Sequence, residues 1–107
     1  MTITGELVDI LRATRVQDIP PAALDIAKQV CLDGLGVMIA GAGEPLGLGR
    51  ITFEYTRQLG GPADSSVIAG GFKTSAFNAA YANGTLGHAL DFDNTWWPLN
   101  HPTSPTL

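Results

Sequence analysis

Charged and chemically reactive side chains are scarce in this 107-residue chain. Only 15% of the residues are charged, ten acids against six bases give a net charge of −4, and there are two histidines and one cysteine. No cluster of lysine or arginine occurs, which argues against nucleic acid or an anionic membrane surface as a partner. Cys31 permits no internal disulfide, and its apolar neighbours favour a buried small hydrophobic residue over a reactive thiol.

The chain also lacks a long uninterrupted apolar run and a basic leader segment. Its longest apolar stretch, residues 30–42, is broken by Asp33 and by three glycines, so it is too short to span a membrane and is expected to form a core helix. Glu6 and Asp9 make the amino-terminal segment acidic, which does not fit a secretory signal. These features predict a cytoplasmic protein.

The composition is that of a folded chain, because 45% of the residues are hydrophobic. A chain of this length forms one small domain at most and buries only about two thirds of its unfolded surface. It contains no internal repeat, low-complexity tract or domain boundary. Packed helices or a buried piece of a larger protein both fit this composition, and we favour the second.

Apolar periodicity predicts an all-α fold of about four to five packed helices with one short extended segment. The expected helices cover about residues 4–14, a long segment that starts at Pro20-Pro21, about residues 47–59, and a segment capped by Thr74 or Ser75; residues 65–69 are expected to be extended. The first helix is expected to pack by one face. The apolar stripes expected on the second and third helices are Leu24, Ala27, Cys31, Leu35 and Met38, and Leu48, Ile51, Tyr55 and Leu59.

Two polar or flexible features interrupt the second helix. Gly34 and Gly36 each weaken a helix by about 1 kcal/mol relative to alanine, which makes sense if another helix backbone approaches closely there. Asp33 is expected to cap a neighbouring element or to accept a hydrogen bond from it.

In the third helix, Arg50 and Glu54 are expected to form a surface ion pair worth about 0.3–0.5 kcal/mol.

The segment from His88 to Pro102 gathers both histidines of the chain with two aspartates, a threonine and two tryptophans. If the fourth helix persists, one face carries Phe77, Tyr81, Gly84, His88, Asp91 and Thr95, so the polar cluster is expected to continue a buried stripe. On such a face a lone histidine is more often a satisfied core residue than a catalyst, and this interpretation is favoured for His88. Pro98 and Pro102 place His101 on a loop, where site residues often lie.

A cluster of histidine, aspartate and threonine suits the binding of a substrate carboxylate or hydroxyl and the movement of a proton. A metal site made by His88, Asp91, Asp93 and His101 is possible, but Asp93 would lie about 140° round a helix from His88 and no established ligand spacing appears. We therefore predict no metal. The patterns of a serine hydrolase and of a phosphate-binding loop are absent, and packing is favoured over a pocket wall for Trp96 and Trp97.

Several short motifs carry a resemblance to the MmgE/PrpD family of lyases, which includes 2-methylcitrate dehydratases and cis-aconitate decarboxylases. The resemblance covers essentially the whole chain, with weaker agreement at Asp33, Gly34 and Gly36. Its order of motifs is specific: Ser66-Val67-Ile68-Ala69-Gly70, Lys73-Thr74-Ser75-Ala76, Ala79-Ala80-Tyr81-Ala82-Asn83-Gly84, His88-Ala89-Leu90-Asp91-Phe92-Asp93, Thr95 and His101-Pro102.

This resemblance implies a large helical domain with a second, lid domain, homodimeric, acting on small di- or tricarboxylic acids without an iron–sulfur cluster or other cofactor. Residues 1–107 would then be part of the amino-terminal helical domain. Asp91, Thr95 and His101 match active-site residues of the decarboxylase branch, with Asp91 and His101 expected to be catalytic and His88 to join them in substrate binding. Asn94, where many members have a second aspartate, and Thr103, in place of a frequent serine, depart from the family pattern.

Other classes of function remain open from the residues. The chain can be a non-catalytic helical remnant, or one part of a split enzyme whose other part is a separate polypeptide. In either case, and also for a fragment of a complete enzyme, we expect negligible turnover by these 107 residues alone, because the further basic residues expected to clamp the substrate are not among them.

Overall fold

The computed structural model describes residues 2–95. The elements follow in the order α1 (Ile3–Ala13), a 3-10 helix η1 (Val16–Asp18), α2 (Pro21–Ala42), α3 (Leu48–Leu59), β1 (Ser65–Val67), β2 (Phe72–Thr74) and α4 (Ala76–His88). The mostly helical fold predicted from the sequence is confirmed, and the helix bounds differ from the predicted ones by a residue or two at their starts.

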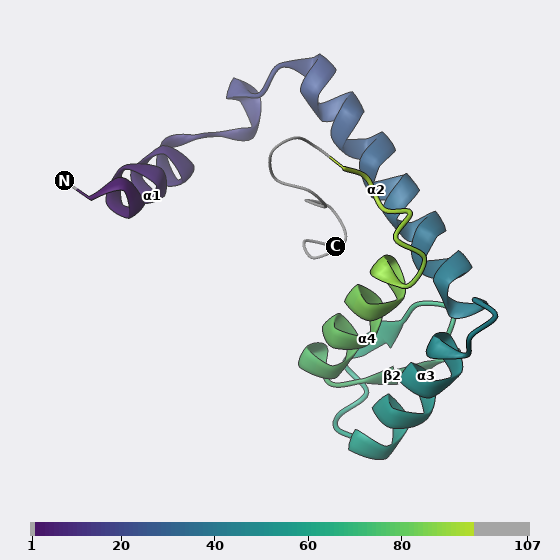
Figure 1. Ribbon diagram of the computed structural model, residues 1–107. Helices are drawn as coiled ribbons and strands as arrows, with labels where there is room; N and C mark the ends of the chain where they lie inside the picture. Colours follow the sequence, from purple (N-terminus) through teal and green to yellow (C-terminus); the bar gives the residue numbers. More distant parts are fainter. Residues whose placement is uncertain (1, 96–107) are drawn as a thin grey trace.

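Helix α2 is the longest element, and both α3 and α4 pack against it (Figure 1). Pro21 occupies its first turn, where a missing backbone N–H costs nothing because that group has no partner inside the helix. The turn into α3 is held by Glu44, a buried residue whose carboxylate accepts backbone N–H groups of Leu46 and Leu48. Met38 of α2 and Leu86 of α4 are among the fully buried side chains.

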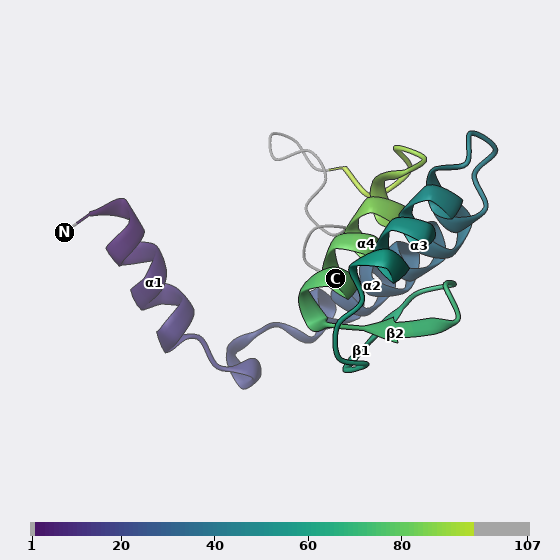
Figure 2. The same ribbon diagram turned by 90° about the horizontal axis from the view of Figure 1, so that it is seen from below.

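A small β-hairpin lies against α4 on the side shown in Figure 2. Strands β1 and β2 are antiparallel, with Val67 opposite Phe72. Val67 joins Ala79 and Ala82 of α4 in a small core, and Phe53 and Phe72 pack against it. The predicted extended segment is therefore confirmed over Ser65–Val67, whereas the second strand was missed.

The closest backbone contacts occur at two glycines near the α2–α3 turn. A Cβ at Gly41 would collide with the carbonyl of Leu86, and one at Gly49 would collide with the backbone of Ala42. Gly36, for which the sequence suggested such an approach, has nothing within 4 Å of the position its Cβ would take, whereas Gly34 is buried. The expectation for Gly36 was wrong, because α4 approaches α2 at Gly41, nearer the carboxyl end of α2.

The bulky apolar stripes predicted for α2 and α3 are not the faces that the chain buries. The stripe of α3 remains exposed, and its buried residues are Gly49, Thr52 and Thr56. On α2 only Met38 of the predicted stripe is buried, and Cys31 is exposed rather than buried. Small residues let the backbones approach closely, and the larger side chains are thereby turned outward.

Helix α1 lies apart from the other helices in both views (Figures 1 and 2). Thr2 caps it by accepting the N–H of Gly5, and its apolar side chains face one way along the helix. None of its residues is buried, and Leu7 is 55% exposed. The prediction that α1 packs by one face was therefore wrong within the described chain. None of the helices among residues 2–95 has the length and apolar character needed to cross a membrane.

Candidate active site

Helix α4 carries the first residue of the site. Ser75 caps it by accepting the N–H of Asn78, and its buried side is made of small residues and one leucine: Ala79, Ala82, Leu86 and Gly87. Packing of this side against α2 and the hairpin fixes the position of the helix end. The helix ends at His88, and the N–H of Asp91 donates to the carbonyl of His88 at 3.1 Å to close the following turn.

The end of α4 overturns the predicted helical face. Asp91 has a φ of 51°, a left-handed conformation that no α-helical residue adopts. Asp91 and Thr95 therefore do not share a helix face with His88. The apolar part of that face is not buried either, because Phe77 is 80% exposed and Tyr81 54% exposed.

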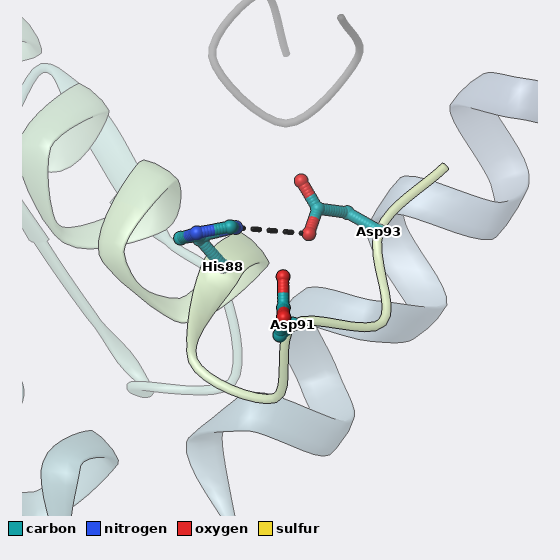
Figure 3. A group of neighbouring side chains, drawn as sticks. All are labelled: His88, Asp91 and Asp93. Carbon is teal, nitrogen blue, oxygen red and sulfur yellow. Dashed lines mark hydrogen bonds and ion pairs between the residues drawn. The ribbon is translucent and has the colours of Figure 1, made fainter. Parts of the chain in front are cut away.

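Three side chains nevertheless converge just after the helix: His88, Asp91 and Asp93 (Figure 3). Their nearest ligand-type atoms all lie within 4.8 Å of one another. Nδ1 of His88 lies 3.0 Å from Oδ1 of Asp93, and the two are hydrogen-bonded. The left-handed turn at Asp91 brings the chain back over the helix end, which a continuing helix could not do.

This convergence also removes the geometric argument against a shared cation, since Asp93 does not lie on the far side of a helix. The three groups are close enough to hold a metal ion. However, Nδ1 of His88 and Oδ1 of Asp93 already bind each other, and a cation would have to displace that hydrogen bond. We therefore treat the group as a hydrogen-bonded acid–base cluster.

The three residues differ strongly in burial. The side chain of Asp93 is 1% exposed, whereas that of His88 is 56% exposed and Asp91 is also exposed. His88 is thus not the satisfied core histidine that the sequence left open. The hydrogen bond to Asp93, and then the charge of Asp93, raise the pKa of His88 above 6.5; desolvation opposes this, and the charge of Asp91 adds to it. Both carboxylates favour the protonated imidazole.

Asp93 is the site residue that the sequence reasoning set aside. A usable signal was present, because the segment Leu90-Asp91-Phe92-Asp93 alternates apolar and acidic residues, a pattern that does not fit the 3.6-residue period of a continuing helix. Leu90 and Phe92 indeed line a groove along α2, with Asp33, Gly36, Val37 and Ala40. Asp91 and Asp93 lie on the side of His88.

The remaining predicted residues are placed only in part. Thr95 is exposed at the end of the described chain, and Oδ1 of Asn94 is buried without a hydrogen-bond partner among residues 2–95. Asp33 is exposed and shows no hydrogen bond there, so its expected capping role was wrong within the described chain. His101, with Trp96, Trp97, Pro98, Pro102 and Thr103, lies outside the described residues, and its predicted role stays a prediction.

An acid–base cluster at the end of a small-residue helix, beside an apolar groove, is an arrangement suited to an enzyme that acts on a small polar molecule. The MmgE/PrpD N-terminal domain matches residues 5–107, so the chain belongs to the MmgE/PrpD family. The match covers all but the first two residues of α1, the whole of α2 to α4 and the segment that holds the cluster.

Two relatives are both cis-aconitate decarboxylases. The protein from Mus musculus is 27% identical over 107 residues, and the one from Homo sapiens is 25% identical over the same length. Each comparison covers 99% of this chain, and the chain spans about a fifth of each relative, 22% of its length. No solved structure gives a significant match to the chain.

Proposed function

We propose that this chain is part of a lyase that acts on small di- or tricarboxylic acids, either by decarboxylation or by loss of water. The observation that carries the proposal is the gathering of His88, Asp91 and Asp93 at the end of α4, inside the segment that matches the family. Cis-aconitate is the first substrate to test, because both relatives described above are named for it. A 2-methylcitrate dehydratase-like elimination is the second.

The chemistry needed is proton transfer at a carbon next to a carboxylate. Decarboxylation breaks the bond between carbon and carboxylate, releases CO₂ and requires a proton for the carbon that keeps the electron pair. Dehydration instead removes a proton from carbon and delivers one to the departing hydroxyl. Both reactions benefit from groups that stabilise the negative charge developing beside the carboxylate.

The proposed roles follow from residue type and position. Asp91 and His101 contact the substrate and move the proton, and Thr95 donates a hydrogen bond to a carboxylate. His88 is half exposed beside Asp91, so its imidazole can also reach a bound carboxylate. Asp91 is exposed within the cluster, where a carboxylate can exchange protons with a ligand. The proposed enzyme needs no cofactor, is cytoplasmic and forms a homodimer.

The 107 residues alone are proposed to be inactive. A tricarboxylate carries up to three negative charges near neutral pH, whereas the segment from His88 to Thr95 contains no lysine or arginine. The further cationic groups that such a substrate needs are proposed to come from other polypeptide. The bulky side chains exposed along α1, α2 and α3 also fit a chain that further protein covers, either its own continuation or a separate polypeptide of a split enzyme.

The first experiment is the intact mass of the protein made from its natural gene, followed by a turnover assay with cis-aconitate and 2-methylcitrate. A mass four to five times that of this chain, with turnover of either acid, is the expected result, since the chain spans 22% of its relatives. A natural chain of 11.2 kDa that co-purifies with a second polypeptide indicates the split enzyme. A full natural protein that binds neither acid contradicts the proposal.

A further inference from the structure

Asp93 is the most deeply buried group of the cluster, and no role has yet been assigned to it. Its side chain is 1% exposed, and a buried carboxylate is stable only when hydrogen-bond donors or charges compensate for lost water. Nδ1 of His88 lies 3.0 Å from its Oδ1. The hydrogen-bonded pair, drawn in Figure 3, differs in burial, because the imidazole of His88 is half exposed while the carboxylate of Asp93 is enclosed.

We infer that Asp93 is a positioning residue: it holds His88 through Nδ1, so that the opposite ring nitrogen, Nε2, donates a hydrogen bond to a substrate carboxylate. This inference rests on the proposed function and adds to it the residue that acts behind the substrate contact. A histidine whose Nδ1–H donates to a carboxylate has a fixed ring orientation and a fixed tautomer. Asp93 would therefore act on the substrate only through His88.

Electrostatics supports this geometry. The segment from His88 to Thr95 has no lysine or arginine, so a protonated His88 is its only side chain able to carry a positive charge toward an anionic ligand. The hydrogen bond and charge of Asp93 raise the pKa of His88 and favour that protonated form. The carboxyl end of α4 carries the negative end of the helix dipole, which also favours a cation at His88.

Two charged groups of the described chain face His88, and both come from the turn after α4: Asp91 and Asp93. Helix α4 itself carries no charged side chain before His88. On α2, Asp33 lines the adjoining groove with Leu90 and Phe92 rather than the cluster. Asp93 and Asp91 both favour the protonated imidazole, so substrate binding should be tighter where His88 is protonated and should weaken as the pH rises through its raised pKa.

The test measures kcat and KM for cis-aconitate on the full natural protein at a series of pH values. In Asp93→Asn, which keeps the shape and removes the charge, KM should rise roughly tenfold, the size of effect expected for one charge-assisted hydrogen bond. The change in kcat should be smaller, and KM should begin to rise at a lower pH than in the unaltered protein. The matched control, Asp25→Asn, removes the same charge from an exposed ion pair with Lys28 and should change neither constant.

A double-mutant cycle separates positioning from a merely structural role. The amide nitrogen of glutamine can replace Nε2 of histidine but cannot bind Asp93 in the same way, so His88→Gln should retain part of the substrate contact. In that background Asp93→Asn should have no further effect on KM. An equal rise in KM in both backgrounds would show that Asp93 acts through general stability, and would overturn the inference.

A spectroscopic measurement covers the case in which Asp93→Asn folds poorly. The ring nitrogens of His88, identified as the signals lost in His88→Gln, should show protonation of Nδ1 in the neutral form and a titration midpoint that rises when cis-aconitate binds. A neutral form protonated at Nε2, or a midpoint unaffected by bound cis-aconitate, overturns the inference while leaving the lyase proposal intact. An unaltered protein that binds neither cis-aconitate nor 2-methylcitrate overturns both.

Discussion

Helix α1 and the body formed by α2, α3, the hairpin and α4 use their apolar residues in opposite ways. Along α1 the large side chains form a continuous stripe, yet none of them is buried. In the body, glycine, alanine and threonine fill most of the contact surfaces, and only a few large residues such as Met38 and Leu86 are enclosed. An amphipathic pattern therefore shows that a helix can pack, whereas small residues at the right positions show where helices approach most closely.

The largest expected difference is between core truncations in the two regions. Met38→Ala removes a fully buried side chain and should lower the free energy of unfolding by about 2–5 kcal/mol. Leu7→Ala, on the exposed stripe of α1, should change it by less than about 0.5 kcal/mol. Urea unfolding of the two variants followed by circular dichroism measures both values. Equal losses would mean that α1 packs on the body in solution.

A second pair of variants examines the close approach of backbones within α2. Gly41→Ala places a methyl group against the carbonyl of Leu86 and should destabilise the body by about 1–3 kcal/mol. Gly36→Ala meets nothing within 4 Å and should stabilise the helix by about 1 kcal/mol. Thermal unfolding should move in opposite directions for the two changes. A stabilising Gly41→Ala would contradict the described contact between α2 and α4.

Helix caps give a third comparison, because the same interaction occurs in both regions. Ser75 caps α4 and Thr2 caps α1, each by accepting one backbone N–H. Ser75→Ala should lower the stability of the body by about 1 kcal/mol. Thr2→Ala should reduce helicity without moving the unfolding midpoint of the body, because α1 buries no residue in it. Hydrogen exchange at amides of α2 and α4 distinguishes these outcomes.

The smallest effect concerns pH and the His88–Asp93 pair. Because the pKa of His88 is raised in the folded protein, its contribution to stability is fully present below the unfolded value of 6.5 and is lost as the pH rises through the folded value. The stability difference between Asp93→Asn and the unaltered chain should therefore be larger near pH 6 than near pH 9. Solvent screens the half-exposed imidazole and keeps this difference small. A difference that grows with pH would contradict the described pair.

Much of the local structure could be predicted because its causes are local. Pro21 marks the start of α2, Gly47 with its φ of 88° precedes α3, and Ser75 caps α4. The ion pair of Arg50 and Glu54, at 3.1 Å, also follows from residues one turn apart. The second strand was harder to predict, since a pairing of three residues depends on Val67 and Phe72 meeting across a turn.

The candidate site was located by sequence but its geometry was not. Gathering of histidine and aspartate after residue 87 pointed to the segment in which the structure brings His88, Asp91 and Asp93 together, and the family match covers it. A helical continuation, however, predicted that Asp91 would share a face with His88 and that Asp93 would point away. The left-handed conformation of Asp91 ends the helix instead and turns the chain back. Asp93 therefore lies beside His88 and is hydrogen-bonded to it.

The family, the positions of the helices and the segment that holds the acid–base cluster could be read from residue order alone, because they depend on interactions within one or two turns. Which faces are buried, the close approach at Gly41 and Gly49 rather than at Gly36, and the enclosed position of Asp93 beside His88 became clear from the folded chain. These outcomes depend on where α4 crosses α2 and on how the chain turns after it, and both are set by the packing of residues distant in the sequence.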